Sequence, residues 1–415
     1  MTKTLVHRAS ARLDRLIPGA FQSLVWEIVL ALITFPASIV MSRRLGAEGR
    51  GVLTLAVLVP TTVFTLGTFQ WDRTLRGLIS MKVASPAEAY RRTIGYLRWL
   101  SVPAVLFGIG VTCVYPLSPQ ARLFSALFCT AFPLSFLMTS LMAVYTAAGR
   151  LDITYRIKFL YQATYLVAVC GFALANRVNV PFMITTYVLM HLAAVAYAMR
   201  AVPALTGETN SGGPDWQPLA RGFGPYALES LGARADIWVL SLLATPAILG
   251  QYSAVTTLAS PISMLSMAVA TGSTARLAWT DPLVVRRHLR NVIIAMLACL
   301  LTFGSAAHFL SGWLLHHVLG KDFDDGAWMA TWIVAIAVTQ AIAYQFHTAL
   351  QLSGRQNGYL TVQAIEPIAR ILLTLVGGKI AGIRGVLASF LLITILKSAF
   401  SEWLLRSTRP AVHPS

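Results

Sequence analysis

The sequence predicts an all-α integral membrane protein with about twelve transmembrane helices, arranged as two six-helix lobes related by a pseudo-twofold axis. Three observations lead to this prediction. The composition is strongly apolar, apolar stretches of spanning length follow one another along the whole chain, and a polar segment near the midpoint separates two similar halves.

The composition excludes an ordinary soluble fold. Hydrophobic residues make up 56% of the 415 residues and charged residues only 12%, whereas a soluble domain has roughly 25% charged residues. Basic residues exceed acidic ones by 33 to 16, which gives a formal net charge of +17. In a chain with so few charges this excess belongs in the loops, where it orients the protein in the membrane. It does not indicate nucleic-acid binding.

The apolar stretches match the length of about 20 residues that a helix needs to cross a bilayer. Residues 1–20 precede them as a basic amphipathic segment, which we expect to lie on anionic membrane lipids rather than to be a cleaved signal peptide. The twelve expected spans cover residues 24–42, 52–71, 99–116, 123–147, 157–176, 180–199, 222–245, 248–272, 291–311, 327–350, 359–382 and 385–404.

The basic residues gather in alternate connections between these spans. Most of them fall inside if the N-terminus is cytoplasmic, and this bias predicts that both termini are cytoplasmic. The outer connections are expected to hold only Arg43, Arg44, Arg50, Arg122, Arg177, Lys321, Lys379 and Arg384.

An internal repeat predicts the two lobes. Gly49 and Gly250 are each followed eleven residues later by a proline. Further on, Ser85-Pro86 and Asp281-Pro282 each combine a helix N-cap with a proline at the first helical position and precede a basic pair. We therefore expect an N-terminal lobe over 21–200, a cytoplasmic linker over 201–221, a C-terminal lobe over 222–405 and a cytoplasmic tail over 406–415. An even number of spans in each half makes the repeat parallel.

No catalytic, metal or cofactor site is expected. The sequence has no glycine-rich phosphate loop, HExxH pair or GxSxG elbow. The four cysteines lie singly in apolar runs, without the paired spacing of a metal site or a disulfide. His316 and His317 precede three aspartates, but their spacing is not specific for a metal, and we interpret this segment as a solvated outer loop. The sequence therefore does not predict an enzyme.

Ionisable residues at membrane depth are the informative ones, because such groups are costly in lipid and normally face an interior. The acids Glu27, Glu229 and Asp236 lie in the first span of each lobe, and we expect them to be sites for a coupling proton or sodium ion. Glu366 and Arg370 form a second polar stripe with i,i+4 spacing, and Lys397 is free to pair with any acid. The alternative is that these groups only form interhelical salt bridges that hold the bundle together.

The segment from Leu32 to Pro60 resembles the first hairpin of the Wzx-type polysaccharide-biosynthesis flippases. Their superfamily also contains the lipid II flippases and the multidrug and toxic compound exporters. The turn Leu45-Gly46-Ala47-Glu48-Gly49-Arg50-Gly51 matches the family's Leu-Gly-x-x-Gly-x-Gly pattern, and Gly250-Gln251-Tyr252-Ser253-Ala254 matches its Gly-x-Tyr-x-Ala pattern. With the twelve spans and the midpoint linker, the resemblance extends over nearly the whole chain.

The resemblance implies a V-shaped pair of lobes around a central cavity lined by spans 1, 2, 7 and 8, which opens alternately to the two leaflets. The implied substrate is a polyprenyl-diphosphate-linked oligosaccharide, a repeat unit of O-antigen, capsule or exopolysaccharide, moved across the bacterial cytoplasmic (inner) membrane. A polysaccharide polymerase and glycosyltransferases would be its partners. The candidate ligands for the diphosphate are Arg73, Arg76, Arg234 and Arg276, and those for sugar hydroxyls are Thr34, Ser38, Gln70 and Ser230.

Two other functions fit parts of the same pattern. An ion-coupled drug or cation exporter would share the fold and use Glu27 or Asp236 as its coupling carboxylate. An integral-membrane polysaccharide polymerase would need a sizeable outer loop for its acceptor, and the longest outer connection, near 312–326, is short.

Overall fold

The computed structural model describes residues 20–69, 71–80, 84–115, 117–205, 217–274, 282–353 and 355–407, and all regular structure in these ranges is helical. The amphipathic segment 1–20, most of the linker, the C-terminal tail, Gln70 and Arg276 fall outside the described residues or at their edge.

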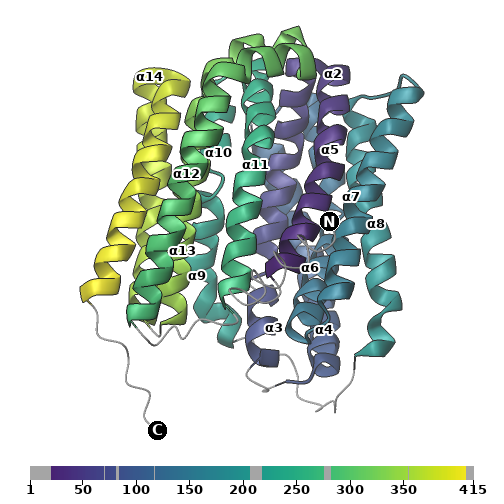
Figure 1. Ribbon diagram of the computed structural model, residues 1–415. Helices are drawn as coiled ribbons and strands as arrows, with labels where there is room; N and C mark the ends of the chain where they lie inside the picture. Colours follow the sequence, from purple (N-terminus) through teal and green to yellow (C-terminus); the bar gives the residue numbers. More distant parts are fainter. Residues whose placement is uncertain are drawn as a thin grey trace, which may run out of the picture. The chain divides into compact units, whose positions relative to one another are not determined.

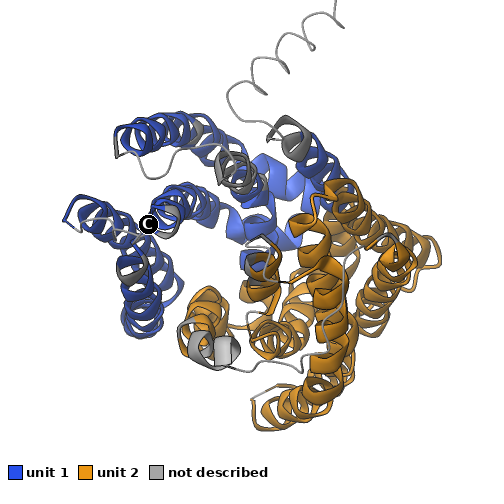
Figure 2. Ribbon diagram, turned by 90° about the horizontal axis from the view of Figure 1, so that it is seen from below, with its two compact units in different colours: residues 1–35, 251–415 blue, residues 36–250 orange. Residues whose placement is uncertain are grey.

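Contacts divide the chain into two compact units, coloured separately in Figure 2. Unit 1 comprises residues 1–35 and 251–415, and unit 2 comprises residues 36–250. The boundaries between the units therefore differ from those of the lobes drawn from the sequence, which stay a prediction.

The helices run in the order shown in Figure 1. The first half of the chain contains α2 (Ala20–Gly67), α3 (Trp71–Ser80), α4 (Pro86–Val114), α5 (Pro119–Cys129), α6 (Phe132–Ala147), α7 (Leu151–Leu174), α8 (Val180–Arg200) and the 3₁₀ turn η1 (Val202–Ala204). The second half contains α9 (Gln217–Gly232), α10 (Ala235–Leu243), α11 (Pro246–Thr274), α12 (Pro282–Leu314), η2 (Leu315–Leu319), η3 (Lys321–Gly326), α13 (Ala327–Leu352) and α14 (Gln356–Ser407).

Helix α2 is folded back on itself. Gly46 has a φ of 67°, which interrupts the helix, and Arg50 Nη1 donates to Ser38 Oγ at 3.1 Å. These two residues would be about 18 Å apart along an unbroken helix. The two arms of α2 on either side of Gly46 therefore correspond to the expected spans 24–42 and 52–71.

Helix α14 is also folded back, at Ala381 and Gly382. Lys397 Nζ lies 3.3 Å from Glu366 Oε2, although the two residues are 31 positions apart, which a straight helix would separate by about 46 Å. The arms cross closely because Gly377 and Gly385 face each other, and a Cβ at either would overlap the backbone of the other.

By length and composition, seven of the described helices could cross a membrane, or eight if α5 and α6, bent by 49° at their junction, form one span. Two of the seven, α2 and α14, are the folded-back pairs. The protein is thus a multi-pass membrane protein, while the exact count of twelve spans stays a prediction.

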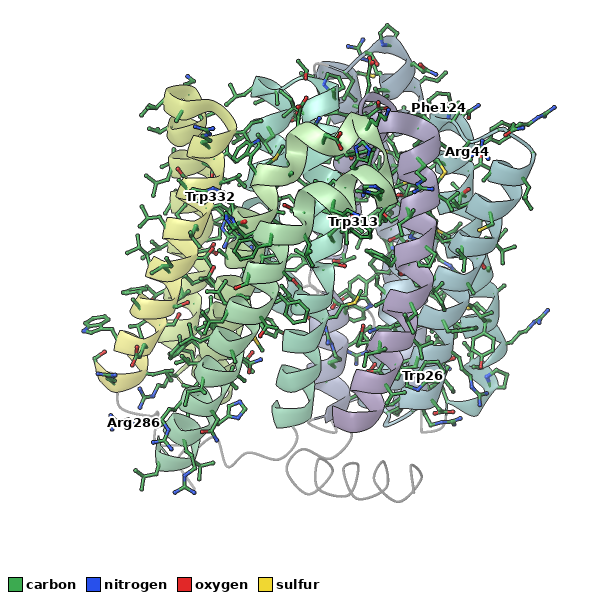
Figure 3. The ribbon with its side chains drawn as sticks, turned by 45° about the horizontal axis from the view of Figure 1, so that its top comes forward. Trp26, Arg44, Phe124, Arg286, Trp313 and Trp332 are labelled. Carbon is green, nitrogen blue, oxygen red and sulfur yellow. The ribbon has the colours of Figure 1, made fainter. Side chains whose placement is uncertain are left out.

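Helix α12 shows features of a spanning helix at both ends. Figure 3 shows the side chains of Arg286 and Trp313 at its opposite ends, and Trp313 is exposed. Cationic residues at one end and an aromatic residue at the other are typical of helices that meet the two membrane–water interfaces.

One helix was not expected from the sequence. The short helix α3 buries Trp71, Leu75 and Ile79 on one face, and Trp71 Nε1 donates to Thr93 Oγ1 at 3.0 Å. The helix begins just after the second arm of α2 and precedes Ser85, which caps α4 by accepting from the Glu88 amide at 3.1 Å. This cap and the proline after it confirm the helix start predicted at Ser85-Pro86.

Candidate functional site

The segment expected to form span 7 is broken in its middle. Helix α9 ends at Gly232 and α10 begins at Ala235, while Arg234, at the N-cap of α10, has a non-helical φ of −119°. Irregular backbone at membrane depth is tolerated where it is buried in protein or lines a cavity. Broken helices of this kind form the binding sites of many transporters.

Arg234 reaches from this break to the second arm of α2. Its Nη1 donates to Thr61 Oγ1 at 3.0 Å, and the Thr61 hydroxyl donates in turn to the carbonyl of Val57 at 2.6 Å. Asp236, which is buried, attracts the guanidinium electrostatically. Among the described residues, Thr61 accepts the one side-chain hydrogen bond that Arg234 makes, and a guanidinium has five N–H donors.

Other polar and aromatic groups continue along the same face of α9 and α10. The hydroxyls of Thr68 and Tyr226 lie 3.1 Å apart, and the hydroxyl of Tyr115, which follows α4, is hydrogen-bonded to Ser241. The rings of Tyr115 and Trp238 meet edge to face at 4.9 Å. We call this group the polar seam of unit 2. Its members are Thr61, Thr68, Tyr115, Tyr226, Arg234, Trp238 and Ser241.

The turn of α2 and the start of α11 touch through glycines within unit 2. A Cβ added at Gly51 would overlap the carbonyl oxygen of Pro246, and one added at Gly250 would overlap that of Ala47. The contact is reciprocal. In the turn of α2, Gly51 follows Ala47 by four positions, and at the start of α11, Gly250 follows Pro246 by four positions. We call these four residues the glycine crossing. It brings Gly250, one of the two glycines of the repeat drawn from the sequence, against the turn that contains the other, Gly49.

Arg50, which the sequence places in an outer connection, is enclosed by the fold. It is only 2% exposed and donates to Ser38 and Ser42. Tyr165 and Tyr187, which lie on α7 and α8, interact with it electrostatically. The guanidinium can reach Ser38 because the chain folds back at Gly46. Ser38, expected to bind sugar hydroxyls, therefore accepts a hydrogen bond from Arg50 in this structure.

The remaining predicted ligands are scattered. Thr34 donates to the Leu30 carbonyl of its own helix at 2.8 Å, and exposed Arg76 pairs with Asp72 on α3 at 2.8 Å. Arg73 also lies on α3. Ser230 is buried on α9. Of the two predicted diphosphate ligands whose side chains the structure describes, Arg76 and Arg234, it is Arg234 that lies at a helix break beside other polar groups.

The three acids proposed for ion coupling lie on two elements. Glu27 is half-buried on the first arm of α2, within unit 1. Glu229 is half-buried on α9, and Asp236 is buried on α10, both in unit 2.

Unit 1 contains a separate charged cluster. Glu366 lies between Arg370, with which it forms the predicted i,i+4 ion pair, and Lys397. The Arg370 guanidinium also covers the ring of Phe390 at 4.4 Å. Lys397, which the sequence left free to pair with any acid, is thus assigned to Glu366. All three are at most 16% exposed, so breaking this cluster would leave a buried charge without compensation.

The segment after α12, which the sequence places outside, contains a contact between a histidine and an aspartate. His316 Nδ1 lies 2.9 Å from Asp324 Oδ2. Within the part of the chain that the structure describes, no group of three or more histidine, cysteine or acidic side chains is arranged to hold a metal ion.

Solved structures with the same arrangement of helices are membrane transporters. An inward-facing multidrug resistance MATE family transporter of the MOP superfamily has a TM-score of 0.68 and 10% sequence identity, with 92% of this chain and 97% of that one covered. The lipid II flippase MurJ, in an inward closed conformation, also has a TM-score of 0.68 and 10% identity, with 92% and 88% covered. The MATE multidrug transporter DinF-BH has a TM-score of 0.60 and 15% identity, with 95% of each chain covered.

No protein-family model and no curated protein matches the sequence. At these identities the structural likeness establishes the fold. The chain therefore has the fold of the superfamily of exporters and flippases, as predicted.

Proposed function

We propose that this protein is a flippase that moves a polyprenyl-diphosphate-linked oligosaccharide across the bacterial inner membrane by alternating access. The observation that carries the proposal is Arg234, a guanidinium at the helix break inside the segment that the sequence predicts as span 7. A diphosphate needs fixed cationic donors away from lipid, and the planar guanidinium binds phosphate oxygens with two parallel hydrogen bonds.

The neighbours of Arg234 suit the rest of such a head group. Hydroxyls of Thr68 and Tyr226 lie along the polar seam and offer hydrogen bonds to sugar hydroxyls. The buried indole Nε1 of Trp238 has no hydrogen-bond partner among the described residues, so it is a further donor. Buried polar groups in this condition are few in native proteins and call for an explanation.

The glycine crossing supplies an element that alternating access needs. Alternation requires two discrete packings of the same helices. At the glycine crossing the two backbones meet without intervening side chains, so the contact is close but involves few atoms that would resist its separation. The crossing lies at the ends of the helices that the sequence places outside. We infer that it closes the outer side in this conformation and separates when the site opens outward.

Exchange of Arg234 tests the proposed head-group site. Arg234→Ala should weaken binding of the lipid-linked oligosaccharide by about 10- to 150-fold, because a hydrogen bond to a charged group is worth about 1.5–3 kcal/mol. Arg234→Lys should restore part of it. Arg44→Ala is the matched control, because exposed Arg44 also makes one side-chain hydrogen bond, to Asn176 at 2.9 Å.

Transport is then measured in proteoliposomes as the appearance of labelled glycan on the far side. Unchanged binding and transport in Arg234→Ala, at a normal level of folded protein, would exclude Arg234 as the diphosphate ligand.

An ion-coupled exporter of drugs or cations is the second candidate. The buried carboxylate of Asp236 beside the helix break favours it, and two of the transporters with the same fold are multidrug transporters by their description. Gradient-driven movement of a cationic dye by the purified protein, without movement of a lipid-linked sugar, would select this function.

A further inference from the structure

An apolar groove opens on unit 2 where the last turns of α4 approach the end of α10. Its volume is about 610 Å³. The residues that line it are Phe107, Gly110, Val111, Val114, Tyr115 and Leu242. The side chains of Val114, Phe107 and Leu242 are 88%, 58% and 55% exposed, so the groove is open along its length.

The groove is continuous with the polar seam. Tyr115 belongs to both, because its ring lines the groove while its hydroxyl bonds to Ser241, the residue before Leu242. Trp238, against the Tyr115 ring, is one helical turn from Arg234. From Arg234 to Leu242 the helix rises about 12 Å. A cationic site and an apolar channel thus lie in line on one helix face.

We propose that this groove holds the isoprenoid chain of the carried lipid while its diphosphate is bound at Arg234. The proposal rests on the function proposed above and adds a second recognition element to it. It also specifies the pose, with the head group at the middle of span 7 and the chain running towards the end of the helix that the sequence places outside.

The position of Arg234 favours the carried lipid over an ordinary membrane phospholipid. The hydrocarbon core of a bilayer is about 30 Å thick, and a phospholipid keeps its phosphate at the edge of that core. An acyl chain of the bilayer can fill the groove but cannot bring its phosphate to a guanidinium in the middle of the span that the sequence predicts over 222–245. A carried lipid whose head group has moved to Arg234 can bind the guanidinium with its diphosphate and the groove with its isoprenoid chain.

Gly110 allows the groove to be filled with little disturbance. A Cβ at Gly110 meets no atom within 4 Å, and the same is true of Gly171 on α7, outside the groove. Gly110→Leu therefore places a side chain in the groove, and Gly171→Leu makes the same exchange on an equally open helix surface of the same unit.

The experiment measures binding of two probes to the full-length protein in nanodiscs of phosphatidylethanolamine and phosphatidylglycerol. One probe is geranyl diphosphate and the other a long-chain polyprenyl diphosphate. We expect Gly110→Leu to weaken binding of the long-chain probe by about tenfold, equivalent to about 1.4 kcal/mol. Binding of geranyl diphosphate should stay unchanged, as should binding of both probes to Gly171→Leu. Arg234→Ala should weaken both.

A photoreactive amino acid in place of Leu242 then identifies the occupant. It should crosslink to the long-chain probe, and an excess of unlabelled geranyl diphosphate should reduce the yield by competing for Arg234. Crosslinking mainly to phosphatidylglycerol, unaffected by either diphosphate, would show an ordinary lipid contact and overturn the proposal.

The binding results separate failure of this proposal from failure of the proposed function. If Arg234→Ala weakens both probes but Gly110→Leu weakens neither, the groove does not bind the chain and the head-group site stands. If the wild-type protein binds neither probe, both proposals fall.

Discussion

Replacing Gly250 by alanine should prevent the glycine crossing from closing. The added Cβ would overlap the carbonyl oxygen of Ala47 and lie 2.8 Å from its carbonyl carbon and 2.9 Å from the Gly51 nitrogen. Carbon atoms in contact prefer about 3.5–4.0 Å, so the two turns must separate by about 1 Å. The obstructing atoms belong to backbone, which cannot rotate away as a side chain can.

The energetic effect follows from the cost of overpacking, typically about 1–3 kcal/mol. If the whole of this cost falls on the closed state, the equilibrium shifts towards the open state by about 5- to 150-fold. Gly250→Ala should therefore impair transport by disfavouring one of the two states, while substrate binding at Arg234 remains.

The assay is a distance measurement between spin labels at Arg44→Cys and Thr245→Cys, two exposed positions near the two turns, on a background without the native cysteines. The wild-type background should show a short-distance population, and Gly250→Ala should reduce it and add a longer one. Gly95→Ala is the matched control, because a Cβ at Gly95 meets no atom within 4 Å. An unchanged distance distribution in Gly250→Ala would show that the turns accommodate the methyl group while closed, which would refute the reasoning.

Three further predictions concern topology, the charged cluster and coupling. Reporter fusions at Gly212 and Lys321 should report opposite sides of the membrane, and the same side for both would contradict the twelve-span arrangement. Glu366→Gln leaves two buried cations without an acid and should lower the free energy of unfolding by about 3–5 kcal/mol. Lys397→Met leaves the Glu366–Arg370 ion pair intact and should lower the free energy of unfolding much less. Equal shifts of the thermal unfolding temperature in the two variants would argue against the cluster. Asp236→Asn should still bind the lipid-linked oligosaccharide but lose stimulation by an imposed proton or sodium gradient, since an ion drives a change only through its differential affinity for the two states. Full stimulation would place coupling elsewhere.

The sequence predicted the fold because apolar length and helix-start signals are local. The expected spans fall on described helices, two of them on the broken pairs α5–α6 and α9–α10, and the cap at Ser85 is where its residue type indicated. The positions of interruptions were harder to predict. The breaks at Gly46, Gly232 and Gly382 all coincide with glycines, but the chain has 29 glycines, and only long-range packing selects which of them end a helix.

The candidate site was predictable only as a set of residue types. Arg234 was identified because an arginine inside an apolar stretch is rare, and the structure supplied its partner Thr61, 173 positions away. Arg50 was missed because its neighbours in sequence are polar and glycine-rich, which is typical of an exposed turn. Its burial depends on Ser38 and two tyrosines brought together by folding. A polar flank therefore does not distinguish a solvated arginine from one enclosed by a helical hairpin.

The distribution of charge within each unit bears on the choice between flippase and cation exporter. A cation exporter needs a carboxylate whose charge is available to the ion, but Glu366 is already bound by Arg370 and Lys397. Asp236 lies two residues from Arg234 and attracts it, so part of its charge is compensated as well. A diphosphate meets the opposite situation. The one side-chain hydrogen bond that Arg234 makes among the described residues goes to neutral Thr61, and a single carboxylate at Asp236 offsets only part of the attraction between the guanidinium and two phosphate groups. An acid beside the cation also serves release, since a site that binds its anion too tightly cannot discharge it on the far side. The same pair of residues therefore suits binding and release of an anionic head group better than capture of a cation.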